Sequence, residues 1–237
     1  MSRVLVVKTG STLPGIRARR GDYESWIARG MGLAADRIGV VDVREGAALP
    51  DPRALAGVVV TGSSAMVSAR EPWSERTAAW LADAIGAGTP VLGICYGHQL
   101  LAHALGGRVG RNPRGREIGT VRLRLAPEAR RDALLGDLPE ATHAHTTHVE
   151  SVLELPPGGT RLAESDADPN QAFAAGPRAW GVQFHPEFDA DVMRGYLESR
   201  RDLLRDEGLD ADRLLALVRE TPEAGSLLRR FAALCGA

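Results

Sequence analysis

The chain has 237 residues, a formal net charge of −1 and only two cysteines. A charge this close to zero argues against a protein whose main partner is nucleic acid or an anionic membrane surface. The composition, 44% hydrophobic and 25% charged, is that of ordinary globular proteins and allows a sizeable core. The apolar run at the N-terminus is too short for a signal peptide, no stretch reaches the length of a membrane span, and two cysteines in unlike contexts form no disulfide framework. We therefore expect a cytoplasmic protein.

Short apolar runs alternate with helical patterns in the first half of the chain. Residues 22–31 and 72–85 carry apolar side chains at helical spacing. The apolar runs that predict buried strands are residues 3–8, 38–43, 56–61 and 91–94. This alternation predicts an α/β fold with a doubly wound, mostly parallel central sheet and helices on both faces. In such sheets ligands bind beyond the carboxyl ends of the strands.

The second half of the chain has a different pattern of apolar residues. Short strands separated by turns predict a small antiparallel extension, at residues 120–125, 152–155, 160–163, 171–174 and 179–184. From residue 189 onward the apolar spacing is helical again. We find no linker, and we expect one α/β domain over residues 1–188 with a C-terminal helical extension, residues 189–237, packed on it.

Cys95 stands at the corner between the strand at 91–94 and a helical pattern that begins at His98. Gly93 and Gly97 flank it two residues away on either side, which gives the Gly-x-nucleophile-x-Gly elbow with sulfur in place of a hydroxyl group. A nucleophile on such a turn points out of the sheet towards substrate, and the helix dipole favours its thiolate form. Cys235 lacks this geometry and is expected to be a packing residue.

His185 and Glu187 supply the partners that a thiol nucleophile needs. The apolar residues 182–184 place His185 at a strand end, and Pro186 stiffens the chain between the imidazole and the carboxylate. Glu187 can then hold one ring nitrogen of His185, while the other faces the thiol. The sequence therefore predicts a catalytic triad of Cys95, His185 and Glu187.

The remaining histidines and the basic runs have plainer explanations. A histidine set without cysteines on one irregular segment is a weak zinc site, so we expect no metal; the set is His143, His145 and His148. His98 and His103 are expected to be packing or surface residues. The basic runs at 17–20 and 108–116 are expected to be solvated loops, with contact to an anionic group as the alternative. No phosphate-binding glycine motif is present, and we expect no cofactor.

The elbow at residues 93–99 and the segment 181–187 together resemble the class I glutamine amidotransferases, the family with a Cys-His-Glu triad and a flavodoxin-like α/β domain. The resemblance covers residues 3–188. It implies a glutaminase: Cys95 attacks the γ-carboxamide of glutamine, ammonia leaves, and water hydrolyses the γ-glutamyl thioester.

The resemblance also implies roles for other residues. The loop at residues 61–64 looks like the oxyanion loop of the family, so Gly62 and the backbone N–H groups of Ser63 and Tyr96 should face the developing oxyanion. Substrate-binding residues are expected in the elbow helix and in the loop that looks like the Ser-His-x-Asp loop of the family: Gln99, Thr147, His148 and Val149. Thr and Glu replace Ser and Asp in that loop.

Within the family, the chain most resembles stand-alone, GMP-synthase-like members, some of which cleave γ-glutamyl amides or peptides. The substrate is therefore expected to be a small molecule, either glutamine or a γ-glutamyl compound cut by the same triad. The loops at residues 17–23 and 66–73 are expected to shape the leaving-group side. The sequence is compatible with a synthase partner and with an oligomer. A non-catalytic binding subunit with this fold is an alternative to an enzyme. A reactive-cysteine chaperone or deglycase is a further alternative, which residues 185–187 argue against.

Overall fold

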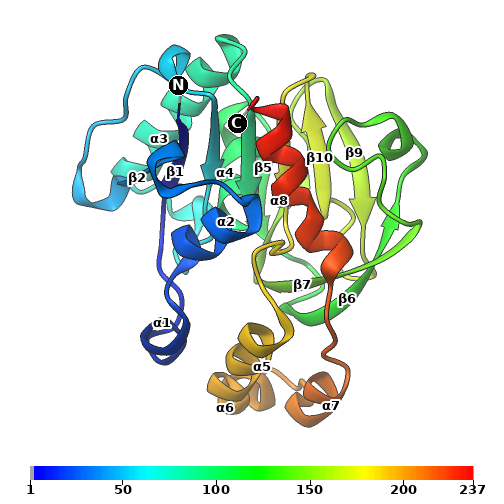
Figure 1. The fold of residues 1–237 in the computed structure, drawn as a ribbon. Coiled ribbons are helices and arrows are strands. Elements are labelled where there is room, and N and C mark those ends of the chain that lie inside the picture. The colour runs from blue at the N-terminus through cyan, green and yellow to red at the C-terminus, as the bar shows by residue number, and fades with distance from the viewer. Residues whose placement is uncertain (1–2, 237) are drawn as a thin grey trace.

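The computed structural model describes residues 3–236, and within this range the chain forms a nine-stranded mixed sheet and a separate two-stranded sheet, with helices on both faces of the large one (Figure 1). The strands are β1 (Val4–Lys8), β2 (Ile38–Asp42), β3 (Gly57–Val60), β4 (Val91–Ile94), β5 (Arg108–Arg111), β6 (Glu117–Leu125), β7 (Ala141–His148), β8 (Glu150–Glu154), β9 (Gly159–Glu164), β10 (Ala172–Ala175) and β11 (Ala179–Val182). The helices are α1 (Pro14–Arg20), α2 (Tyr23–Met31), α3 (Pro72–Gly86), α4 (Tyr96–Ala104), α5 (Ala190–Ser199), α6 (Arg201–Asp206), α7 (Ala211–Ala216) and α8 (Pro222–Leu234).

The parallel half of the sheet is the expected doubly wound core. The strand order is β2-β1-β3-β4-β11-β10-β9-β6-β7, and the pairings from β2 through β11 are all parallel. Side chains of β1 alternate between two cores: Val4 and Val6 join α2, α5 and α8, while Leu5 and Val7 join α3 and α4. Because both faces are covered, these strands are apolar throughout, which is why the sequence predicted them well.

The antiparallel strands continue the same sheet. From β11 the order runs through β10, β9 and β6 to β7, each paired antiparallel with its neighbour. The predicted strands of this half all exist, with ends that differ by a few residues, but the one at 152–155 is β8, which lies in the separate two-stranded sheet. The fold class is therefore confirmed, with the antiparallel extension fused to the edge of the parallel core.

Three expectations about loops are wrong. The segment with three histidines is a regular strand, β7, which pairs with β6 from Ala141 opposite Arg124 to His148 opposite Glu117. Its polar sequence carries no strand signal of its own, and the long antiparallel partner forms it. Part of the basic run at 108–116 is β5, paired with β8, and most of the expected loop at 17–23 lies in α1 and the start of α2.

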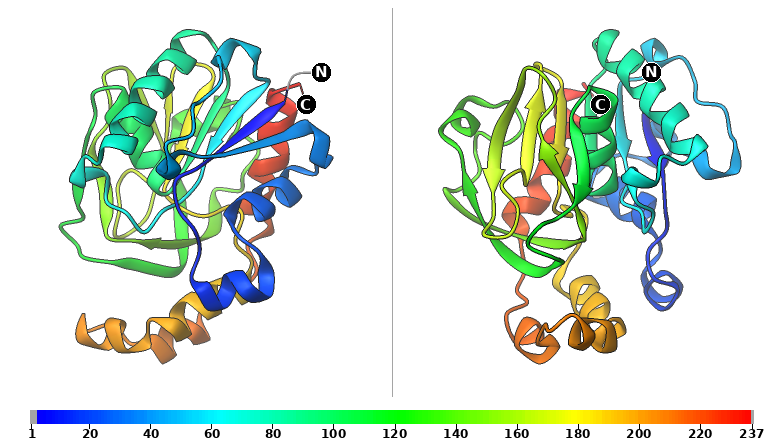
Figure 2. Two further views of the ribbon diagram at one scale, coloured as in Figure 1. Left: turned by 90° about the vertical axis from the view of Figure 1, so that its left-hand side faces the viewer. Right: turned by 180° about the vertical axis from the view of Figure 1, so that it is seen from behind.

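The C-terminal helices return to the α/β core. α8 lies across the sheet beside α2, with Leu228 so close to Gly30 that a Cβ there would approach within 2.4 Å (Figure 1). α5, α6 and α7 gather at the same end as α1, away from both chain ends (Figure 2). The division at residue 188 remains a prediction. None of the helices in residues 3–236 combines the length and apolarity needed to cross a membrane.

We expect Gly97→Ala to lower the free energy of unfolding by about 1–3 kcal/mol. A Cβ at this position would lie 2.4 Å from the backbone oxygen of Val60, so α4 and β3 would have to separate. The matched control is Gly86→Ala at the end of α3, where a Cβ meets nothing within 4 Å and alanine favours the helix. Urea unfolding of both variants measures the difference, and equal stabilities would contradict the close approach.

Candidate active site

Cys95 occupies a strained corner between β4 and α4. Its backbone angles, φ 51° and ψ −101°, lie in a region that residues with a side chain rarely adopt, at a cost of order 1–3 kcal/mol. Its N–H donates to the Val182 carbonyl at 2.8 Å, which anchors the corner to β11. Gly93 and Gly97 permit the turn, because a Cβ on Gly93 would lie 2.3 Å from the Gly97 oxygen.

His185 lies beside Cys95 on the segment that follows β11. Its Nδ1 shares a 2.8 Å hydrogen bond with Glu187 Oε1, and the His185 N–H donates to the His145 carbonyl on β7 at 2.8 Å. The Phe188 ring stacks on the imidazole at 4.1 Å between centroids. Backbone and ring contacts thus hold the imidazole in one plane, with its Nε2 directed away from Glu187.

The thiol and the imidazole shift each other's proton affinity. Burial favours the neutral thiol, but the charge of the neighbouring His185 outweighs burial, so the pKa of Cys95 is lowered. Burial opposes protonation of His185 too, yet Glu187 and Cys95 raise its pKa to about 10. Both shifts act in the same direction, because each favours transfer of the thiol proton to His185.

The loop after β3 reaches the same place. A Cβ on Gly62 would lie 3.0 Å from His185 Cε1 and 3.8 Å from Cys95 Cβ, so this glycine lets the loop pass close to both. The Thr9 hydroxyl donates to the Thr61 carbonyl, at 2.9 Å, and a Cβ on Gly10 would collide with Ser63. In the part of the chain that the structure describes, the backbone N–H groups of Ser63 and Tyr96 have no acceptor.

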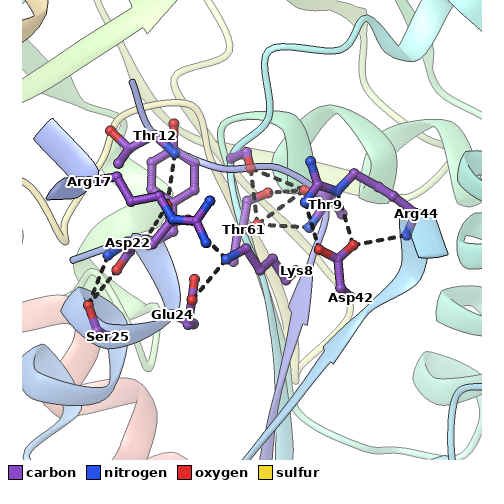
Figure 3. A network of polar contacts seen from close by, with 12 residues as sticks. Lys8, Thr9, Thr12, Arg17, Asp22, Glu24, Ser25, Asp42, Arg44 and Thr61 are labelled. Atoms are coloured by element: carbon purple, nitrogen blue, oxygen red, sulfur yellow. Dashed lines mark hydrogen bonds and ion pairs between the residues drawn. The ribbon is translucent and has the colours of Figure 1, made fainter. Parts of the chain in front are cut away.

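A buried ionic network fixes the loop after β1 (Figure 3). Lys8 donates to Asp22 at 2.9 Å and to Glu24 at 2.8 Å, and the other oxygen of Asp22 accepts from the N–H of Thr12 at 2.8 Å. Burial opposes ionisation of Asp22, but its hydrogen bonds, that from Thr12 foremost, leave its pKa lowered. The carboxylate therefore stays charged and holds the loop in place at neutral pH.

Two cavities meet at Cys95. The first, of about 230 Å³, lies on the side of the elbow helix and is lined by Ser63, Ser64, Ala65, Met66, Cys95, Tyr96, Gln99, Arg116, Thr147, His148, Val149, Glu150, Arg200 and Leu203. The second, of about 160 Å³, lies on the side of His185 and is lined by Ser11, Thr12, Leu13, Pro14, Tyr23, Ser63, Ser64, Cys95, Thr147, His185, Tyr196 and Arg200. A substrate that fills both would place its reacting bond over the sulfur.

The structure brings the predicted substrate-binding residues to the first cavity. The Gln99 amide donates to the Glu150 carbonyl at 2.8 Å and to Gln183 Oε1 at 2.9 Å, which fixes the side chain. The Thr147 carbonyl lies 3.9 Å from Cys95 Sγ. The imidazole of His148 is bonded to Glu117 and to the Glu150 carbonyl, so it supports the wall of the cavity.

The three histidines of β7 do not point to a common site. His145 is buried with Nδ1 3.2 Å from the Thr120 hydroxyl, His148 bonds Glu117, and His143 is half-buried opposite Arg122. Among residues 3–236 no group of three or more histidine, cysteine or acidic side chains could hold a metal ion. His98 is buried against Phe173, as expected of a packing residue.

Sequence reasoning missed the contribution of the C-terminal helices to these cavities. Tyr196 of α5 reaches the second cavity, where its hydroxyl bonds those of Thr12 and Tyr23 at 2.9 and 2.7 Å. Arg200, between α5 and α6, lines both cavities and donates to the Thr147 hydroxyl at 2.8 Å. The apolar spacing after residue 189 predicted helices there, but no motif marked Tyr196 or Arg200 as part of the site.

The sequence profile of the family "Glutamine amidotransferase class-I" matches residues 40–200, more than half of the chain. The chain belongs to the class I glutamine amidotransferases. The glutamine-hydrolysing GMP synthase of Aeropyrum pernix is 37% identical to this amidotransferase over 185 residues, which are 78% of this chain and 32% of that protein. A glutamine-hydrolysing GMP synthase subunit of Thermococcus kodakarensis is 39% identical over 115 residues, 46% of this chain and 59% of that protein.

A solved structure extends the similarity to the whole chain. A glutamine amidotransferase of Thermotoga maritima superposes with a TM-score of 0.78 and 25% identity, and the match covers 100% of this amidotransferase and 99% of that chain. By contrast, the chain spans less than two thirds of the length of each curated relative named above. The fold of the residues that follow the family match is thus shared with a solved amidotransferase.

We expect Cys95 to react with iodoacetamide at least ~10-fold faster than Cys235 near neutral pH, because only a thiolate attacks. The pKa of Cys95 is lowered, whereas burial raises that of Cys235 to about 12. Exposure alone predicts the reverse order, since Cys95 is buried and Cys235 half-buried. Mass mapping of alkylated peptides over time measures both rates, with urea-unfolded protein as the control in which the thiols should react alike. Faster labelling of Cys235 in the folded protein would refute the thiolate assignment.

Proposed function

We propose that this amidotransferase hydrolyses the γ-carboxamide of glutamine through a triad of Cys95, His185 and Glu187. The observation that carries the proposal is the geometry of the elbow: Cys95 on its strained corner lines one cavity with His185, and Glu187 Oε1 lies 2.8 Å from Nδ1 of that imidazole. A thiol nucleophile, a histidine base and a carboxylate that orients the histidine are the groups that this reaction needs.

The reaction proceeds in two halves. The Cys95 thiolate attacks the γ-carbonyl carbon, the C–N bond breaks, and the nitrogen takes the proton of His185 and leaves as ammonia. A water molecule then attacks the γ-glutamyl thioester, gives a proton to His185, and releases glutamate as the C–S bond breaks. Glu187 orients the imidazole and stabilises its charge throughout.

The oxyanion and the glutamyl chain have separate binding groups in this proposal. The backbone N–H groups of Ser63 and Tyr96 donate to the oxyanion, and Gly62 lets the loop approach the sulfur. The first cavity holds the glutamyl chain, with Gln99 and the backbone of Thr147, His148 and Val149 as contacts. The alternative, a γ-glutamyl hydrolase, uses the same groups with a larger leaving amine.

The proposal also covers the domain bounds, a partner protein and the cellular location. Residues 1–188 form the amidotransferase domain, and residues 189–237 are an extension packed on it. The relative from Thermococcus kodakarensis is named as one subunit of a GMP synthase, which supports a synthase as partner for the ammonia released here. We propose the cytoplasm as the site of action.

The test is glutamate formation from glutamine by the wild-type protein and its variants. Because the residues of a triad act as a unit, Cys95→Ala and His185→Asn should each lower kcat at least ~1000-fold, and Glu187→Gln by ~100-fold or more. An acid-quenched sample of wild type should carry a γ-glutamyl group on Cys95, detected as a mass increase of its peptide.

Cys235→Ala is the matched control, because it removes the other thiol far from the elbow and should keep the wild-type rate. Glutamate formation that persists in Cys95→Ala would overturn the assignment of the nucleophile. A wild-type protein that forms neither glutamate nor the thioester, whether alone or with a synthase, would favour a non-catalytic role.

A further inference from the structure

The second cavity at Cys95 lies where a leaving group must lie. The group that protonates the departing nitrogen has to be within hydrogen-bond reach of it, so the amine leaves on the side of His185. His185 lines the second cavity, whereas Gln99 and Tyr96 line the first. The glutamyl chain and the leaving amine are therefore assigned to different cavities, which meet at Cys95.

This leaving-group cavity is larger than ammonia requires. Its volume is about 160 Å³, against ~30 Å³ for a water molecule in the liquid, which is similar in size to ammonia. Its walls are built from ordered parts of the chain. The hydroxyl of Tyr196 bonds those of Thr12 and Tyr23. The carboxylate of Asp22 accepts from the backbone N–H of Thr12 and fixes its position (Figure 3). The space is thus a shaped subsite for an amine with several heavy atoms.

Arg200 supplies a cation to this subsite. Its guanidinium lies 5.1 Å from the centroid of the Tyr196 ring and donates to the Thr147 hydroxyl. Among the described residues no carboxylate forms an ion pair with it, whereas Arg116, the other arginine of the first cavity, is bonded twice to Glu207, at 2.7 and 3.0 Å. Burial lowers the pKa of Arg200, the direction expected of a desolvated cation without an anionic partner.

We propose that the second cavity binds a leaving amine that carries a carboxylate, and that Arg200 recognises this carboxylate. The inference rests on the proposed function, because the same triad cleaves the bond. The substrate class becomes γ-glutamyl derivatives of amino acids, with glutamine as the smallest compound that fits. An arginine suits this task because its planar donors match a carboxylate and it keeps its charge when half-buried.

The chemistry balances as for glutamine. Thiolate attack breaks the C–N bond to the amino acid, whose nitrogen takes the proton of His185, and the amino acid leaves from the second cavity. Water then hydrolyses the γ-glutamyl thioester and returns a proton to His185. The products are glutamate and a free amino acid, and no other reactant is needed.

The experiment compares γ-glutamylglycine with γ-glutamylglycinamide, which have the same shape and differ in the charge of the leaving amine. For wild type we expect kcat/KM to be at least ~10-fold higher for γ-glutamylglycine, the usual effect of one charge-assisted pair. Arg200→Gln should bring the ratio of the two substrates to about one, and Arg200→Lys should restore part of it. The control is Arg116→Gln, which should leave the ratio as in wild type.

The outcomes separate this inference from the proposed function. If wild type hydrolyses glutamine but neither dipeptide, or both dipeptides equally well, the leaving-group subsite is refuted and the glutaminase stands. If Arg200→Gln lowers the rates on glutamine and both dipeptides by one common factor, Arg200 serves the glutamyl part or the fold, and the inference is wrong. If no γ-glutamyl compound is hydrolysed, the proposed function fails and the inference with it. The ratio of kcat/KM for the two dipeptides is measured on the wild-type protein, so it tests the leaving-group subsite even if an Arg200 variant fails to fold.

Discussion

The strained conformation of Cys95 is the constraint on which the rest of the site depends. A residue with φ 51° persists only where its surroundings hold it, and here β11 and β3 do so through backbone contacts on both sides of the elbow. Glycines at 93 and 97 remove the side chains that would prevent these contacts. Buried packing of the parallel core thus offsets the local strain, and the sulfur is left facing two cavities.

Electrostatics at this edge of the sheet depends on burial. Cys95 and His185 are buried, the Phe188 ring stacks on the imidazole, and the Glu187 side chain is covered, so charges here are poorly screened and each group strongly affects the proton affinity of its neighbours. A second ionic group, Lys8 with Asp22 and Glu24, is buried behind the loop after β1. The triad residues set the protonation of the thiol and the imidazole, whereas the Lys8 network fixes the position of the loop. In both groups the interactions between charges are strong because the region is buried.

The C-terminal helices are part of the site as well as of the core. α8 packs against α2, and α5 is followed directly by Arg200, whose side chain reaches both cavities. Tyr196 joins the hydroxyl chain of the second cavity from the same helix. The C-terminal helices therefore complete the wall of the second cavity. They also give that wall a hydroxyl group, from Tyr196, and a positive charge, from Arg200.

The sequence by itself determined the parallel core and the elbow, because buried strands and a glycine-flanked corner leave strong local patterns. It also brought His185 and Glu187 to a strand end, since Pro186 and the apolar run before it act over a few residues. The tertiary structure alone decided β7, whose polar residues pair with β6 across the chain, and the position of Arg200, which depends on how α5 packs. Contacts between distant segments carry no periodicity or spacing, so a cavity formed from the loop after β1, from β7 and from α5 becomes visible only once the chain is folded.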